Sequence, residues 1–145
     1  MAAGLLLACA ALLMTPAQGT LTVGVVVVDD QVVFRQVARE VVAATPGFEM
    51  LGEAVSGEHT LAVVDDLDPD LVLLDVRMPG MDGIETAARL SEARPKVVVV
   101  LISIEEAPYL PGGLGSCGAA ELLRKQDFGP AALRRVWERH RPARG

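Results

Sequence analysis

The sequence predicts an α/β fold: a doubly wound parallel sheet of five strands, with helices on both faces and a weak or missing fourth helix. Three observations predict it. Short runs of valine, leucine and isoleucine alternate with segments of helical periodicity. Hydrophobic residues make up 51% of the 145 residues, but aromatic residues only 3%, so the core must be largely aliphatic. Such cores are typical of helices packed on a buried parallel sheet.

The first predicted strand, residues 23–28 (VGVVVV), is continuously apolar, as in strands buried on both faces. A helix is expected over residues 31–44, because apolar side chains recur there at helical spacing. These side chains are Val33, Val37, Val41 and Ala44. A proline and a glycine then end the helix, and residues 48–55 predict a second, weaker strand.

The middle of the chain repeats this alternation of helix and strand. Ser56 is placed to cap a helix that ends before Pro69, with Leu61 and Val64 on its inner face. The short run at residues 71–74 (LVLL) is expected to form the central strand. The Met-Pro-Gly and Asp-Gly signals that follow predict a loop.

The last part of the chain completes the pattern, except in one segment. A third helix is expected over residues 84–93, a fourth strand over 97–102, a fifth strand over 119–123 and a last helix over 130–139. The last helix starts with a proline, which suits a first turn. Residues 105–118 (EEAPYLPGGLGSCG) contain two prolines and four glycines, which oppose a helix. We therefore expect a loop or one short turn there.

The first twenty residues are treated apart from the fold. Residues 4–14 (GLLLACAALLM) form an apolar run that is too short to span a bilayer. Small residues follow it as in a secretory signal, but no Lys or Arg precedes it. Three interpretations of this segment are possible: a secretory signal, a surface helix, or extra translated sequence upstream of the true start. We favour the last two. We predict an N-terminal leader or extension at 1–20 and one domain at 21–145.

Composition argues against several classes of function. The net charge of −6 does not favour direct binding to nucleic acid. The basic cluster near the C-terminus is interpreted as a solvated helix face and tail. It consists of Arg134, Arg135, Arg139, Arg141 and Arg144. The two cysteines, Cys9 and Cys117, form no CxxC pair, which disfavours a zinc site and fits a reducing compartment. A cytoplasmic protein without a membrane partner is expected.

Polar side chains follow four of the predicted strands. Asp29 and Asp30 end the first strand, Asp75 the third, Ser103 the fourth, and Lys125 follows the fifth. The carboxyl ends of parallel strands share one edge of the sheet, so these groups are expected to converge. A single aspartate at a strand end is usually a turn or cap residue, but the joint arrangement is harder to explain in that way.

This set of side chains suits phosphoryl transfer. Three adjacent carboxylates repel one another, and a hard cation such as Mg²⁺ relieves the repulsion. A carboxylate can act as the nucleophile and form an aspartyl phosphate. Lys125 and Ser103 can contact phosphoryl oxygens. His59 and His140 are not placed to act as a base. Nearby aspartates at a helix end are interpreted as solvated charges; they are Asp65, Asp66, Asp68 and Asp70.

The segment LVLLDVRMPGMDGIE, residues 71–85, resembles the phosphoacceptor region of response-regulator receiver domains, which have a flavodoxin-like fold. The resemblance extends over about residues 22–139 and includes the Asp pair, the serine and the lysine. It implies that Asp75 is the phosphoacceptor and that Asp30 binds Mg²⁺ directly. Asp29 would help through water, and Asp75 and the backbone carbonyl of Arg77 would also be metal ligands. By the same resemblance, Ser103 and Lys125 would contact the phosphoryl group, while Pro79 and Gly83 would shape the neighbouring loop.

Three positions or segments depart from the family pattern. The family often has an aromatic residue three positions before the lysine, and here that residue is Leu122. Ile104, after the serine, is bulkier than the small residue often found there. Residues 105–118, which the family normally folds into a helix at its signalling and dimerisation face, are rich in glycine and proline.

Three functions are compared on this basis. The leading one is a phosphorylation switch whose partner is a histidine kinase or a phosphotransfer protein. A second copy of the chain, forming a homodimer, is a further possible partner. The second is a degenerate receiver that acts as an interaction module. A hydrolase with an aspartate nucleophile ranks low, because Arg77 stands where such enzymes have a second acid; we do not expect a turnover enzyme. The chain is either a stand-alone receiver or a piece of a regulator with a DNA-binding output domain.

Overall fold

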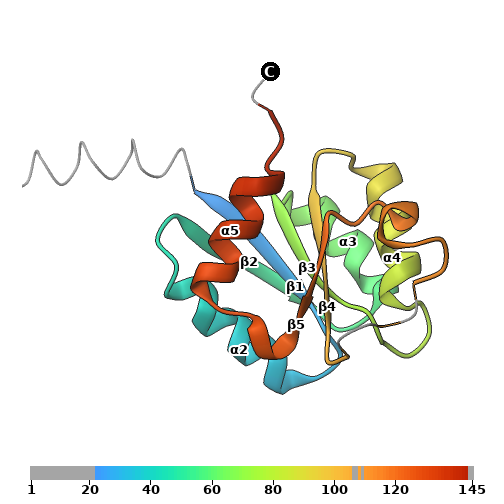
Figure 1. The fold of residues 1–145 in the computed structure, drawn as a ribbon, viewed down its shortest axis with the longest axis horizontal. Coiled ribbons are helices and arrows are strands. Elements are labelled where there is room, and N and C mark those ends of the chain that lie inside the picture. Colours follow the sequence, from blue (N-terminus) through green and yellow to red (C-terminus); the bar gives the residue numbers. More distant parts are fainter. Residues whose placement is uncertain (1–21, 106–107, 109, 144–145) are drawn as a thin grey trace, which may run out of the picture.

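The computed structural model describes residues 22–105, 108 and 110–143 (Figure 1). Five parallel strands form one sheet in the order β2-β1-β3-β4-β5. The strands are β1 (Val23–Val28), β2 (Phe48–Ala54), β3 (Leu71–Asp75), β4 (Val98–Ser103) and β5 (Glu121–Arg124). The winding reverses between β1 and β3, as in flavodoxin-like sheets. The predicted fold class is confirmed.

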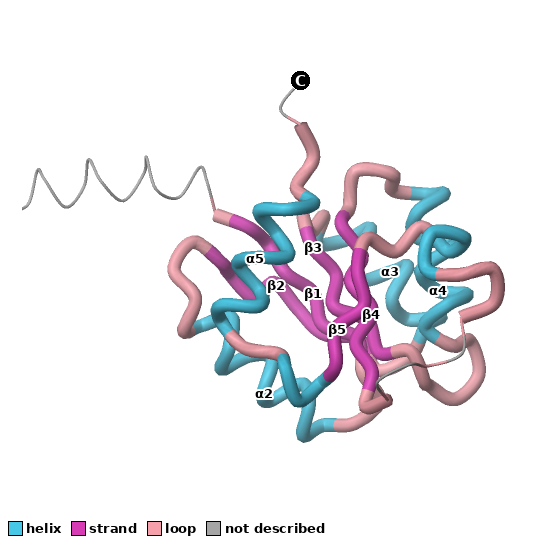
Figure 2. Tube along the Cα trace, viewed as in Figure 1, coloured by secondary structure: helices cyan, strands magenta, loops and turns pink. Residues whose placement is uncertain are grey.

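Helices cover both faces of this sheet. In the described part of the chain they are α2 (Val32–Ala43), α3 (Gly57–Leu67), α4 (Gly83–Ala93) and α5 (Pro130–His140). Figure 2 shows α2 and α5 on one face and α3 and α4 on the other. Buried side chains of α2 and α5 join one core cluster, and those of α3 and α4 join a second. The core therefore has two layers, separated by the sheet.

The central strands explain why the sequence runs there are continuously apolar. Every residue of β1, β3 and β4 is buried. Successive side chains of a strand point to opposite faces. Val25 and Val27 belong to the cluster of α2 and α5, and Val26 and Val28 to the cluster of α3 and α4. With a core on each side, both faces of these strands are apolar until the carboxyl ends, where β3 closes with Asp75 and β4 with Ser103.

The face of α2 that packs on the sheet differs from the stripe recognised in the sequence. Phe34, Ala38 and Val42 are buried, whereas Val33 is 66% and Val37 37% exposed. The helix is apolar along two neighbouring stripes, so helical spacing alone identifies the helix but not its buried side. The larger Phe34 side chain reaches the core. Val33 and Val37 of the expected stripe face outward, whereas Val41 packs partly against the core.

The connection between β4 and β5 carries no α-helix among its described residues. It contains one 3₁₀ turn, η1 (Leu114–Cys117). Gly112 and Gly113 precede this turn with φ angles of 74° and 85°, which L side chains adopt only with strain. The expected loop with one short turn is confirmed for this part of the chain. A second 3₁₀ turn, η2 (Lys125–Asp127), follows β5.

Gly83 lets α4 begin directly against the end of β3. A Cβ atom at this position would lie 2.1 Å from the backbone oxygen of Asp75. The Asp82 side chain caps the helix by accepting the backbone N–H of Glu85 at 2.9 Å. At α3, Ser56 caps as predicted, accepting the N–H of His59 at 3.1 Å. These starts set the loops beside the carboxyl edge of the sheet.

The aspartates near the end of α3 are exposed as expected, but most of them have partners. Arg94 pairs with Asp65 at 2.9 Å and with Asp68 at 3.0 Å, which ties α3 to the end of α4. Asp70 accepts the backbone N–H of Gly24 at 2.8 Å. Their interpretation as merely solvated charges was therefore incomplete.

Some sequence predictions lie outside the described residues. These are the leader at 1–20, with Cys9, and the end of the chain with Arg144. Cys117 is a buried free thiol. Among the helices that the structure describes, none has the length and hydropathy needed to cross a membrane.

Candidate functional site

The strand ends bring the predicted polar residues to one edge of the sheet. Val28 of β1 pairs with Leu74 of β3, so the residues that follow these two strands lie level with each other. Asp75 in turn pairs with Ile102 of β4. The register of the sheet, which local sequence patterns do not specify, thus aligns the acidic strand ends.

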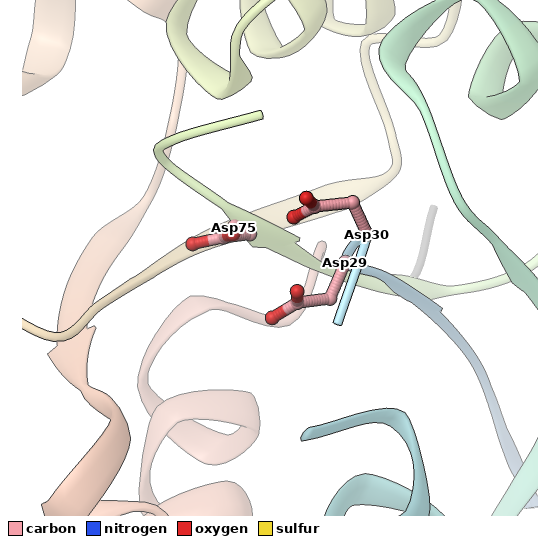
Figure 3. A group of neighbouring side chains, drawn as sticks. All are labelled: Asp29, Asp30 and Asp75. Atoms are coloured by element: carbon pink, nitrogen blue, oxygen red, sulfur yellow. The ribbon is translucent and has the colours of Figure 1, made fainter. Parts of the chain in front are cut away.

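Three carboxylates meet at this edge. Oxygen atoms of Asp29, Asp30 and Asp75 lie within 4.8 Å of one another. Figure 3 shows the Asp29 and Asp30 side chains from the end of β1 on either side of Asp75 from β3. Asp29 is fully buried and Asp75 is 6% exposed, whereas Asp30 is exposed. One carboxylate of the group is therefore open to solvent, and two are enclosed.

Lys125 partly balances this charge. Its Nζ atom lies 2.7 Å from Oδ2 of Asp29 and 3.8 Å from Oδ1 of Asp75. The contact with Asp29 is an ion pair without the geometry of a hydrogen bond. The other Asp29 oxygen accepts the backbone N–H of Gln31 at 2.7 Å. One ammonium thus faces three acids, which leaves the group with excess negative charge.

The pKa of Asp75 is raised from its usual value of 3.8 to about 6. Burial is the main cause, because it penalises the charged form, and the negative charge of Asp29 adds to it. Lys125 and the backbone N–H of Arg77 act in the opposite direction, and Asp30 raises the pKa slightly further. A cation at this position would favour the ionised carboxylate.

The remaining predicted residues surround a pocket of about 430 Å³ in front of Asp75. Ser103, Arg77 and Lys125 line it together with Asp30. Ser103 is 3% exposed, and its Oγ atom accepts the backbone N–H of Glu105 at 3.0 Å. Its hydroxyl proton can still be donated. The Arg77 side chain is exposed at the rim and pairs with Glu105.

The donor set fits a hard divalent cation. All three converging side chains offer carboxylate oxygens, which are the ligands that Mg²⁺ prefers. Two of these carboxylates are enclosed and one of them has a raised pKa, so the site holds negative charge that is not fully balanced. The acidic group therefore has the chemistry of a magnesium site.

Sequence reasoning missed one residue beside the site. The ring centroid of Phe34, in the first turn of α2, lies 4.8 Å from Nζ of Lys125. The signal was present, since Phe34 is the only aromatic residue within that helical segment. Ile104 is 77% exposed at the rim of the pocket. Leu122 is partly buried against the cluster of α3 and α4.

The fold and this acidic edge define a receiver domain. A family model described as response regulator receiver domain matches residues 25–137. The chain belongs to this family, as its resemblance to receiver domains predicted.

Individual relatives agree with the family. The chain is 37% identical over 101 residues to the response regulator GacA of Pseudomonas viridiflava, covering 70% of this chain and 47% of the relative. It is 35% identical over 80 residues to the nitrate/nitrite response regulator protein NarL of Escherichia coli, covering 55% and 37%. The chain thus spans about half the length, or less, of these curated relatives.

Solved structures give the same fold. The signal receiver domain of the response regulator NarL from Mycobacterium tuberculosis superposes with a TM-score of 0.70 at 33% identity, covering 79% of this chain and 96% of that one. The response regulator domain of Thermotoga maritima CheB gives a TM-score of 0.73 at 22% identity, covering 83% and 99%. The latter likeness is one of fold alone.

Proposed function

We propose that this receiver domain is a phosphorylation-dependent switch in a two-component phosphorelay and that Asp75 accepts the phosphoryl group. The observation that carries the proposal is the position of Asp75. Its carboxylate is nearly enclosed, 3.8 Å from the Lys125 ammonium and within 4.8 Å of two further carboxylates. No other aspartate among the described residues combines a pocket, an ammonium and an acidic group in this way.

In the proposed transfer, the Asp75 carboxylate attacks phosphorus on a phosphohistidine of the donor. The new O–P bond forms as the bond from phosphorus to the imidazole nitrogen breaks, and the nitrogen keeps the electron pair. Lys125 contacts a phosphoryl oxygen, and Ser103 donates a hydrogen bond to another. Each of these groups already lines the pocket in front of Asp75.

Asp29, Asp30, Asp75 and the backbone carbonyl of Arg77 would hold Mg²⁺, directly or through water. When bound, the ion neutralises negative charge that develops on the transferred phosphoryl group. Asp30 is the exposed member of the set and would be a direct ligand. The partner would be a histidine kinase or a phosphotransfer protein. We also propose that the protein is cytoplasmic and is not a turnover enzyme. The proposed domain division is a leader or extension at 1–20 and a receiver domain at 21–145.

Intact-mass measurement after treatment with acetyl phosphate tests the acceptor and the ion together. The chain should gain the mass of one phosphoryl group with Mg²⁺ and little without it. The Asp75→Asn variant should gain none, and the Asp66→Asn variant, altered at an exposed aspartate of α3, should behave like the unaltered chain. Equal labelling of the Asp75→Asn variant would overturn the proposal.

A second candidate is a degenerate receiver that serves as an interaction module. Two observations favour it: the described part of the connection between β4 and β5 forms only a short 3₁₀ turn, and Leu122 replaces the usual ring. Phosphorylation would then occur without consequence. Labelling of Asp75 with no change in oligomeric state or in partner affinity would favour this candidate. Two further possibilities belong to this proposal: the receiver forms a homodimer, or it acts with a DNA-binding output domain if the chain is a piece of a longer regulator.

A further inference from the structure

Lys125 has a third neighbour besides the two carboxylates that it contacts. Its Nζ atom lies 4.8 Å from the centroid of the Phe34 ring, as well as 2.7 Å from Asp29 and 3.8 Å from Asp75. A cation over an aromatic face is attracted by the negative potential of the ring. The Lys125 side chain is 17% exposed, so water screens this attraction only partly. The ammonium is therefore placed by two acids and one ring.

A second ring supports the first. The centroids of Phe34 and Phe128 lie 5.7 Å apart at an interplanar angle of 49°, and both side chains are buried. Phe128 follows directly after the turn η2 that starts at Lys125, and its backbone N–H donates to the Lys125 carbonyl at 3.3 Å. The two rings thus join the first turn of α2 to the turn that leads into α5.

Phosphorylation would change the balance of forces on this ammonium. The Lys125 ammonium now lies nearer to Asp29 than to Asp75. A phosphoryl group on Asp75 places additional negative charge and new acceptor oxygens on that side. A compact ammonium on a flexible stem follows the stronger acceptor. Movement toward Asp75 would alter its contact with the Phe34 face.

We propose that the Phe34–Phe128 pair positions Lys125 and responds when Lys125 is drawn to the phosphoryl group. Phe34 is then a positioning residue, and the response reaches α2 and α5 through the two rings. This route needs no ring at Leu122, which packs with the opposite core cluster. The inference rests on the proposed function, since it concerns the response of the same site to phosphorylation.

The experiment uses NMR of the full chain with ¹³C-labelled lysine. The chain has two lysines, so the spectrum holds one ε-methylene signal from Lys125 and one from the exposed Lys96, an internal reference. Protons over a ring face are shifted upfield, so the Lys125 signal should lie upfield of the Lys96 signal. In the unaltered chain, acetyl phosphate with Mg²⁺ should move the Lys125 signal and leave the Lys96 signal in place.

Three variants separate positioning from packing. Phe34→Leu keeps an apolar side chain but removes the ring, so the upfield shift should be lost. The rate of phosphorylation by acetyl phosphate should then fall about three- to tenfold. Phe34→Tyr restores the ring and should restore both properties. Phe48→Leu is the matched control, because that ring also lies beside a cation, Arg134, on the same core layer and away from the site.

The outcomes distinguish this inference from the function on which it rests. An unchanged Lys125 signal in Phe34→Leu, or equal slowing by Phe34→Leu and Phe48→Leu, would overturn the inference. The inference would also be overturned if the unaltered chain gained the full phosphoryl mass but its Lys125 signal did not move. This test does not depend on how any variant folds. Absence of the mass gain itself would instead overturn the proposed function.

Discussion

Asp75 is the residue whose ionisation conflicts most clearly with its surroundings. Its carboxylate is 6% exposed and its pKa is about 6, against 3.8 when unfolded. The unfolded chain therefore releases this proton at lower pH than the folded chain does. As pH rises from about 4 to above 6, ionisation favours the unfolded state, and the domain loses stability.

Asp75→Asn should accordingly stabilise the fold at neutral pH. A shift from 3.8 to about 6 already includes the attraction to Lys125 and corresponds to at most about 3 kcal/mol, so we expect a gain of about 1–3 kcal/mol. Urea unfolding at pH 7 measures it. The gain should vanish below about pH 3, where Asp75 is protonated in both the folded and the unfolded state. An equal gain at both pH values, or an equal gain in Asp66→Asn, would contradict the electrostatic explanation.

Lys125→Ala tests the ammonium at the same site. The substitution removes the positive charge next to Asp29 and Asp75, so repulsion between the two acids increases. We expect intact mass to show that some phosphorylation by acetyl phosphate persists, while the conformational response to it is blunted. The control is Lys96→Ala at an exposed position, which should change neither property. A normal response in Lys125→Ala would exclude the proposed role.

Asp30→Ala tests the exposed ligand of the acidic group. The change removes one of the three oxygen donors that lie within 4.8 Å. Affinity for Mg²⁺, measured by calorimetric titration, should fall at least about tenfold. The same titration of Asp127→Ala, an exposed aspartate outside the group, should be unchanged. A similar loss in both variants would indicate a general effect of net charge.

At the scale of elements, the start of α4 depends on one glycine. Gly83→Ala would place a methyl group 2.1 Å from the backbone oxygen of Asp75. Either α4 or the end of β3 must move, and we expect a loss of about 1–3 kcal/mol in the free energy of unfolding. Chemical denaturation checks this. Gly115→Ala is the matched control, because a Cβ there meets nothing within 4 Å. Similar losses in the two variants would point to backbone entropy rather than to the close contact.

For the molecule as a whole, the acidic group exists only when the sheet is formed. Asp30 follows β1 and Asp75 ends β3, so the unfolded chain does not hold their oxygens together. Mg²⁺ should therefore stabilise the entire domain. At 100 times its dissociation constant the gain is about 2.7 kcal/mol, measured as a shift in thermal or urea unfolding. In the Asp30→Ala variant, the same Mg²⁺ concentration should raise the free energy of unfolding by less. An equal increase in the variant and in the unaltered chain would mean that the ion binds elsewhere.

Local patterns were sufficient to predict the order of elements, because each depends on a few neighbouring residues. The run at Val23–Val28 predicted a buried strand, the prolines and glycines after Ser103 predicted a missing helix, and Ser56 predicted a cap. The strand-end rule also predicted which polar side chains would meet. These inferences needed only periodicity, breakers and the common direction of parallel strands.

Tertiary packing decided the burial of side chains and the contacts between segments that are far apart in the sequence. Periodicity could not choose between the two apolar stripes of α2, and only the core selected Phe34 over Val33. The cation–ring contact of Phe34 with Lys125 and the raised pKa of Asp75 likewise arise from side chains far apart in the chain. The sequence alone thus determined the elements and the chemical groups at their ends. Their burial and mutual distances came from the packing of the sheet, because charge and contact energies depend on neighbours in space.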